Sequence, residues 1–187
     1  YVQPWEIIHN PNVDQGEIIR ESFSSTNLNQ NYRIDIYLPP NYNTSKNYPT
    51  IYIHDGSDYL DLANSKNIIE NLLDSNKIAP FIGVFITPNE RNSELGFEKR
   101  NNYSKFIVNE LVPYIDENYS TSKQKEDRAI MGTSLGGNIS AYIVYNFPDV
   151  FSKCGLHSAA FWVNNYEVYS FFVDSKKLDG DFHSIWG

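Results

Sequence analysis

Hydrophobic and polar residues alternate along residues 32–38, whose sequence is YRIDIYL. Ile34, Ile36 and Leu38 fall on one side of an extended chain, and the residues between them fall on the other. A period of two over this length predicts a strand that is buried on one face only. The two prolines that follow predict its end, because proline cannot donate a hydrogen bond to a sheet.

Short apolar runs alternate with segments of helical spacing along the rest of the chain. The expected strands are 50–56 (TIYIHDG), 81–88 (FIGVFITP), 128–132 (RAIMG), 153–160 (KCGLHSAA) and the beginning of another within 176–187 (KKLDGDFHSIWG). The expected helices are 63–74, 102–119 and 136–147. This alternation predicts an α/β fold, with a mostly parallel sheet and helices on both faces. Ligands bind such sheets at the carboxyl ends of the strands, where HDG, GTSLGG and HSAAFW lie.

Composition and charge narrow the classes of function. The chain has 187 residues, of which 41% are hydrophobic, so a single globular domain spanning residues 1–187 is expected. The formal net charge of -8 argues against nucleic-acid binding, which needs a cationic surface. No apolar run approaches the length of a membrane-spanning helix, so no membrane partner is expected.

Two single residues add to this picture. Cys154 is the only cysteine, which excludes an internal disulfide and a multi-cysteine metal site, and its apolar neighbours predict that it is buried. The chain begins at Tyr1 rather than at a methionine. We therefore expect a processed protein or an excised domain, whose targeting segment is out of view.

The stretch MGTSLGG, residues 131–137, contains the pattern G-x-S-x-G. Small residues cluster in many turns, so the pattern alone also fits an ordinary turn serine. Here an expected strand precedes the pattern and an expected helix follows it, which is the setting of a nucleophile elbow. Ser134 is therefore the candidate nucleophile. The N–H of Leu135, at the N-terminus of the helix, is the candidate donor to an oxyanion.

A second oxyanion donor is expected in the loop after an earlier strand. HDGSDY, residues 54–59, has that position, and Gly56 permits a tight turn. The N–H of Ser57 is the candidate donor. The alternative is an ordinary turn in which Asp and Gly occur for conformational reasons.

Several of these segments together resemble the α/β-hydrolase esterases that include enterochelin esterases and the feruloyl and acetylxylan esterases. YRIDIYLPPNY is similar to the family's first strand and turn, and YPTIYIHDG to its oxyanion strand. The block DRAIMGTSLGGNISAYIVYNFPDVFSKCGLHSAAFW is the most specific, because it resembles the nucleophile elbow, its helix and the next strand. ERNSEL, residues 90–95, resembles a stretch of the enterochelin branch. The resemblance covers almost the whole chain and implies a three-layer α/β/α sandwich and serine ester hydrolysis without a metal or organic cofactor.

The partners of the serine are harder to find. A serine hydroxyl needs a base, and the base an orienting carboxylate, in the chain order serine, acid, histidine. His157 follows an expected strand and is interpreted as a wall of the cleft. Asp174 and His183 have the right order, but DFHSIWG fits a strand better than a catalytic loop. We therefore expect the acid and base beyond Gly187, in a chain that lacks its C-terminal part, with Asp174 and His183 as the fallback pair.

The favoured function is a serine carboxylic ester hydrolase that acts on plant cell-wall carbohydrate esters, feruloyl or acetyl. Its partner is then a small-molecule or polysaccharide-linked ester, and Phe161, Trp162 and Tyr59 are expected to line an acyl pocket unless they are core or rim residues. The alternatives are a siderophore esterase of the enterochelin type and a non-catalytic module that binds carbohydrate or a protein. The single cysteine and the many Tyr and Asn residues are compatible with a secreted or extracytoplasmic protein.

We predict that the 187-residue chain alone hydrolyses esters very poorly, because no base takes the proton of the serine hydroxyl. Adding the downstream sequence of the parent protein should rescue the rate, because the oxyanion hole alone leaves on the order of 10³-fold acceleration over water. Hydrolysis of methyl ferulate by both proteins measures this, with thermal unfolding to show that each is folded. A folded 187-residue chain as active as the extended one would contradict the prediction.

Overall fold

A single sheet organises the chain in the computed structural model, which describes residues 7–173 and the backbone of 174 and 181–185. The strands within these residues are β1 (Glu17–Ser25), β2 (Gln30–Leu38), β3 (Thr50–His54), β4 (Ile82–Thr87), β5 (Arg128–Thr133), β6 (Lys153–His157) and β7 (Asp181–Ile185). They lie in the order β1-β2-β4-β3-β5-β6-β7. β1 and β2 are antiparallel to their neighbours, whereas β4, β3, β5, β6 and β7 run parallel. The expectation of a mostly parallel sheet is confirmed.

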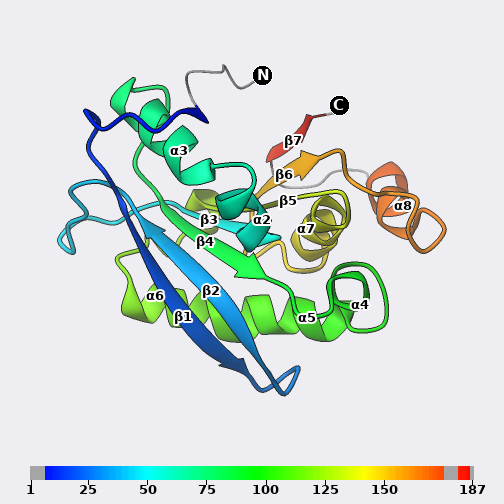
Figure 1. Ribbon diagram of the computed structural model, residues 1–187. Coiled ribbons are helices and arrows are strands. Elements are labelled where there is room, and N and C mark those ends of the chain that lie inside the picture. The colour runs from blue at the N-terminus through cyan, green and yellow to red at the C-terminus, as the bar shows by residue number, and fades with distance from the viewer. Residues whose placement is uncertain (1–6, 175–180, 186–187) are drawn as a thin grey trace.

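Helices cover both faces of the sheet (Figure 1). They are α2 (Gly56–Asp61), α3 (Ser65–Asp74), α4 (Arg91–Leu95), α5 (Arg100–Phe106), a π-helical segment η1 (Ile107–Leu111), α6 (Val112–Asn118), a short 3-10 turn η2 (Lys125–Asp127), α7 (Leu135–Asn146) and α8 (Glu167–Asp174). The larger core packs α5, η1, α6 and α7 against one face, and a smaller core packs α2 and α3 against the other. The result is the three-layer α/β/α arrangement of an α/β-hydrolase.

The prediction that the strand at residues 32–38 is buried on one face only was wrong, because both faces are covered. Ile34 and Ile36 point into the larger core, as expected. Tyr37, on the other face, is equally buried because the smaller core under α2 and α3 covers it. Asp35 is also fully buried, and its two carboxylate oxygens accept hydrogen bonds from Nε of Arg20 at 2.6 Å and Nε of Arg33 at 2.7 Å. A paired carboxylate can occupy such a buried position, which alternation in the sequence does not reveal.

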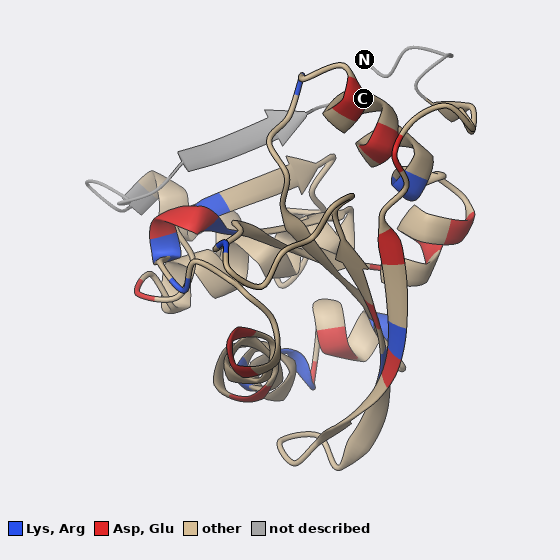
Figure 2. Ribbon diagram, turned by 90° about the vertical axis from the view of Figure 1, so that its left-hand side faces the viewer, with Lys and Arg blue, Asp and Glu red and all other residues tan. Residues whose placement is uncertain are grey.

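Other elements were not foreseen from the sequence. They are β1, the short helices α2 and α4, and α8. β1 forms a hairpin with β2 in which charged residues of both signs follow one another, as Figure 2 shows. The helix expected over 102–119 is present but is widened by the π-helical segment in its middle. Cys154 is 1% exposed within the larger core, as predicted. Along the described residues, we find no helix long and apolar enough to cross a membrane.

Glu94 of α4 is a fully buried carboxylate that fastens this helix to the sheet. Its Oε1 accepts a hydrogen bond from the Tyr32 hydroxyl at 2.7 Å, and its Oε2 accepts one from the Asn89 N–H at 3.0 Å. Burial, reinforced by this carboxylate, raises the pKa of Tyr32 well above its ordinary value, so the hydroxyl stays a donor. The ERNSEL stretch is thus an anchored helix whose position the sheet determines.

We predict that Tyr32→Phe lowers the free energy of unfolding by about 1–3 kcal/mol, because it leaves a buried carboxylate oxygen without its donor. Tyr114→Phe is the matched control, since the Tyr114 hydroxyl donates at 2.6 Å to Glu21, which is only partly buried. The control should cost less than about 1 kcal/mol. Urea denaturation of the three proteins measures the difference, and equal losses would contradict the role given to Glu94.

Candidate functional site

Ser134 lies at the sharp turn between β5 and α7, with φ 57° and ψ -113°. A non-glycine residue rarely adopts a positive φ, and such a conformation costs about 1–3 kcal/mol. Three backbone hydrogen bonds hold it in place. Its N–H donates to the His157 carbonyl at 2.9 Å, and its carbonyl accepts from the N–H groups of Asn138 at 3.1 Å and Ala160 at 2.9 Å. The strained serine is therefore locked between its own helix and the loop after β6.

Glycines allow the two sides of this turn to approach one another. A Cβ on Gly132 would lie 2.6 Å from the carbonyl carbon of Gly136, which is backbone and cannot move aside. A Cβ on Gly137 would lie 2.9 Å from the Cβ of Ala159. The glycines of GTSLGG are thus explained by close packing around Ser134, as a nucleophile elbow requires.

The two predicted oxyanion donors have different surroundings. Leu135 is the first residue of α7, so its N–H is one of those that have no acceptor within the helix. The expected loop around Ser57 is instead the short helix α2, and the N–H of Ser57 donates to the hydroxyl of Thr87 at 3.2 Å. The N–H of Ser57 can therefore donate to an oxyanion only if its hydrogen bond to Thr87 is broken.

Asp55 and Arg91 form an ion pair beside the turn, which the sequence did not reveal. Nε and Nη2 of Arg91 donate to the two carboxylate oxygens of Asp55, each at 2.8 Å. The Asp55 side chain is 7% exposed, and Oδ2 lies 3.3 Å from where a Cβ on Gly136 would be. Hydrogen bonding to Asp55 raises the pKa of Arg91, so the guanidinium stays charged. The carboxylate packed against the start of α7 is therefore neutralised by α4.

His54 occupies the end of β3 behind this ion pair and is fully buried. Its Nδ1 lies 3.0 Å from the Tyr103 hydroxyl. Burial lowers its pKa from 6.5 to about 3, because the charged imidazolium would be desolvated. His54 is thus a neutral core residue, consistent with its place before the serine in the chain.

His157 is half-buried at the end of β6, and Tyr59 holds its ring. Nδ1 of His157 lies 2.9 Å from the Tyr59 hydroxyl, which also lies 2.8 Å from Oγ1 of Thr133. Burial lowers the pKa of His157. These contacts agree with the interpretation of His157 as a wall residue that touches Ser134 through its backbone carbonyl.

The fallback triad residues lie at the edge of what the structure describes. The backbone of His183 is in β7, opposite Gly155 of β6, which confirms that DFHSIWG contains a strand. Asp174 ends α8. The side chains of both residues lie outside the described residues, so their catalytic roles, and the expectation that the acid and base lie beyond Gly187, stay predictions.

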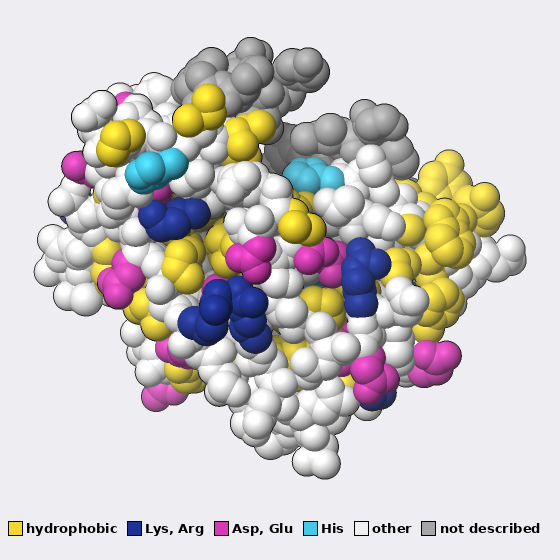
Figure 3. Space-filling view, viewed as in Figure 1, with side chains coloured by type: hydrophobic (Ala, Val, Ile, Leu, Met, Phe, Trp, Pro, Cys, Tyr) yellow, Lys and Arg dark blue, Asp and Glu magenta, His cyan; other side chains and the backbone are white. Residues whose placement is uncertain are grey.

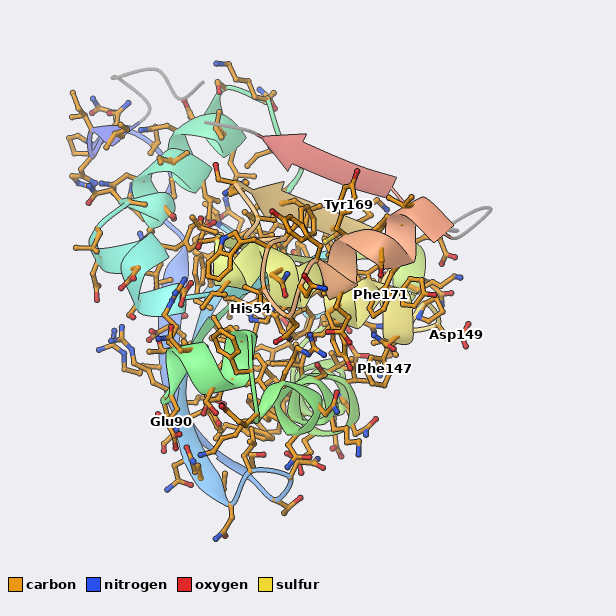
Figure 4. The ribbon with its side chains drawn as sticks, turned by 90° about the vertical axis from the view of Figure 1, so that its right-hand side faces the viewer. His54, Glu90, Phe147, Asp149, Tyr169 and Phe171 are labelled. Carbon is orange, nitrogen blue, oxygen red and sulfur yellow. The ribbon has the colours of Figure 1, made fainter. Side chains whose placement is uncertain are left out.

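An aromatic hollow of about 520 Å³ adjoins the turn on the side of α8. It is lined by Ala159, Phe161, Trp162, Tyr166 and Tyr169. Phe171 stacks on Tyr145 of α7 with 4.4 Å between ring centroids, and this contact fixes α8, from which Tyr169 also projects (Figure 4). Hydrophobic side chains gather over this part of the surface in Figure 3. Phe161 and Trp162 thus line a hollow, and their role in an acyl pocket stays a prediction.

A second hollow of about 230 Å³ lies on the side of α2. It is lined by Asp55, Asp58, Tyr59, Ala63, Arg91 and Thr133. Figure 1 shows α2 and α8 on opposite sides of α7, at whose start Ser134 lies. Tyr59, which was expected in the acyl pocket, belongs to this second hollow. In residues 7–173 no three His, Cys, Asp or Glu side chains come together as metal ligands.

Comparison with known sequences shows what this arrangement resembles. A sequence model of the family described as putative esterase matches residues 25–183. The uncharacterized protein YjcH of Bacillus subtilis is 32% identical over 148 residues, which cover 76% of this chain and 62% of that protein. The endo-1,4-beta-xylanase/feruloyl esterase of Xylanibacter ruminicola is 28% identical over 159 residues, 78% of this chain and 22% of that protein. The chain thus spans less than two thirds of either relative.

Solved structures share the fold. One is a serine-to-alanine mutant of the feruloyl esterase module from Clostridium thermocellum complexed with sinapinate, with a TM-score of 0.81 and 18% identity over all of this chain and 71% of that one. Another is the enterochelin esterase from Shigella flexneri, with a TM-score of 0.73 and 19% identity over 86% of this chain and 40% of that one. At these identities the likeness shows the α/β-hydrolase-type fold.

We predict that the free energy of unfolding falls as pH is lowered from 6.5, because unfolded His54 takes up a proton that the folded residue, with its pKa of about 3, does not bind. The contribution of His54 is complete above pH 6.5 and falls by up to about 1.4 kcal/mol per pH unit below it. Urea denaturation at pH 7.5, 6.5 and 5.5 should show a shallower slope for His54→Gln. The variant His9→Gln, at an exposed position, should keep the slope of the unchanged protein. Equal slopes in all three would contradict the prediction.

Proposed function

Because the chain belongs to the putative esterase family, we propose that it is a serine carboxylic ester hydrolase with Ser134 as its nucleophile. The conformation of Ser134 carries this proposal. The residue is held at positive φ at a strand-to-helix turn by backbone hydrogen bonds from two directions. Strained backbone conformations of this kind cluster at active sites, and α/β-hydrolases place their nucleophile at a strand-to-helix turn.

In the proposed reaction, the Ser134 hydroxyl attacks the ester carbonyl carbon while a base takes its proton. The carbonyl oxygen then carries the negative charge, which the N–H of Leu135 stabilises at the positive end of α7. The N–H of Ser57 becomes a second donor to this oxygen when its hydrogen bond to Thr87 is broken. Collapse of this intermediate releases the alcohol, which takes up the proton, and water hydrolyses the acyl-enzyme to the acid.

We further propose that the base and its orienting acid come from outside the described residues. His54 is buried and His157 is held by Tyr59, so both are engaged elsewhere. The favoured source is sequence beyond Gly187, and the pair Asp174 and His183 is the fallback.

The proposed substrate is a feruloyl or acetyl ester of plant cell-wall carbohydrate. The aromatic hollow supports an aryl acyl group, because Phe161, Trp162 and Tyr169 offer ring faces for stacking. The Xylanibacter relative, whose name includes feruloyl esterase, points the same way. A secreted or extracytoplasmic location would fit such a polysaccharide-linked substrate.

Two alternatives have observations of their own. A siderophore esterase of the enterochelin type is favoured by the ERNSEL helix and by the fold shared with the Shigella enzyme. A non-catalytic binding module would need neither base nor acid. Covalent labelling of Ser134 separates the module from both enzymes, and hydrolysis of methyl ferulate against a catecholate lactone separates the two substrates.

We predict that a fluorophosphonate probe labels Ser134 in the complete protein and that Ser134→Ala lowers turnover by about 10⁴-fold or more. Mass spectrometry locates the adduct, and methyl ferulate hydrolysis measures the loss. Ser65→Ala, at the start of α3 and remote from the turn, is the control and should keep both labelling and turnover. An adduct on another residue, or an active Ser134→Ala variant, would refute the assignment.

A further inference from the structure

We propose that Arg91 is a positioning residue of the reaction, which acts through Asp55 and does not touch the reacting atoms. By pairing with Asp55, it keeps a nearly buried carboxylate from repelling the negative charge that develops on the ester oxygen. This inference rests on the proposed function of Ser134. It gives α4 a part in the rate of the reaction, although no residue of α4 was expected in the site.

Asp55 lies where the end of β3 meets the start of α7. Its backbone has φ 56° and ψ 40°, a left-handed conformation that Asp and Asn adopt more readily than most residues. Its carbonyl accepts hydrogen bonds from the N–H groups of Asp58 at 2.9 Å and Tyr59 at 3.2 Å, which begin α2. A Cβ on Gly136 would lie 3.3 Å from Oδ2 of Asp55. The carboxylate therefore lies beside the first turn of α7, where Leu135 carries the proposed oxyanion donor.

A bare carboxylate in this place would oppose the reaction. The first turn of α7 attracts anions, because its N–H groups lack acceptors within the helix. The Asp55 carboxylate and the oxyanion are drawn to the same helix end, and they repel one another. The Asp55 side chain is only 7% exposed, so water screens this repulsion poorly. A positive charge held against Asp55 removes it.

Arg91 supplies that charge in a fixed geometry. Its Nε and Nη2 donate to the two oxygens of Asp55 at 2.8 Å each, and such a two-point pair fixes the orientation of both groups. Arg91 begins α4, which Glu94 fastens to Tyr32 of the sheet. The Arg91 side chain is 40% exposed, so it stays hydrated when its partner is removed, whereas the Asp55 carboxylate does not. Removing either partner should therefore have opposite effects on the rate.

A second ion pair beside α4 provides the matched control. Lys99 contacts the carboxylate of Glu90, which directly precedes Arg91 in the chain. The side chains of Lys99 and Glu90 are 33% and 50% exposed, so solvent screens their charges. Lys99→Gln removes one positive charge, as Arg91→Gln does, but it leaves no buried carboxylate unpaired.

The test measures kcat and KM of the complete protein on methyl ferulate and on 4-nitrophenyl acetate. Both acylation and deacylation pass through an oxyanion, so kcat reports the repulsion. Arg91→Gln should lower kcat about 10- to 100-fold with little change in KM, because an unpaired, poorly screened charge then opposes the oxyanion. Asp55→Asn removes that charge and suits the left-handed backbone, so it should not lower kcat. Lys99→Gln should keep both constants.

The double variant Asp55→Asn/Arg91→Gln decides between a charge effect and a merely structural one. It contains no unpaired carboxylate, so it should fold, even where Arg91→Gln alone does not, and should keep kcat within about threefold of the unchanged protein. Thermal unfolding shows which variants are folded. A folded double variant with the loss expected of Arg91→Gln would overturn the inference, as would a raised KM that Asp55→Asn does not correct, since Arg91 would then bind the substrate itself.

Failure of this inference differs from failure of the proposed function. An unchanged protein that hydrolyses esters and is labelled at Ser134, but whose double variant is not rescued, would refute the role of Arg91 alone. A complete, folded protein that hydrolyses neither ester and takes up no fluorophosphonate at Ser134 would refute the proposed function, and the role of Arg91 with it.

Discussion

The backbone of Ser134 is the constraint on which the rest of this site depends. Its positive φ costs about 1–3 kcal/mol and persists only because the surroundings hold it. The three backbone hydrogen bonds that do so come from His157, Asn138 and Ala160. At about 0.5–1.5 kcal/mol each, they offset a strain of this size. The same contacts bring the loop after β6 against the turn, which is why the aromatic hollow opens beside the serine.

Close approach is the second requirement of the turn, and it organises the other side of the site. Gly136 lets the start of α7 pack against His54 and Asp55 at the end of β3. A lone carboxylate in this place would be costly, because it is nearly buried and would oppose an oxyanion at the start of α7. Arg91 neutralises the Asp55 carboxylate by donating two hydrogen bonds of 2.8 Å to it. Arg91 can reach Asp55 because Glu94, one helical turn further on, anchors α4 to Tyr32 of the sheet.

Much of the architecture was accessible from the pattern of residues. The apolar run over residues 81–88 and the strand–GTSLGG–helix order specified local elements, because periodicity and glycine placement act over a few residues. The strand at 32–38 was misjudged, since Asp35 is polar yet buried between Arg20 and Arg33. The hairpin strand β1 was missed although its residues alternate in burial, because exposed polar positions interrupt its apolar signal.

The sequence by itself determined the family, the strained serine turn and the order of the central strands and helices, since these depend on neighbours in the chain. Only the tertiary structure decided what surrounds that turn. The pairing of Asp55 with Arg91 joins residues 36 positions apart, and that of Tyr59 with His157 joins residues 98 apart. It also showed that the N–H of Ser57 is engaged by Thr87 and that separate hollows lie on the α2 and α8 sides of the turn. Contacts of this kind arise when the sheet brings the ends of separate strands to one edge, and no local pattern encodes them.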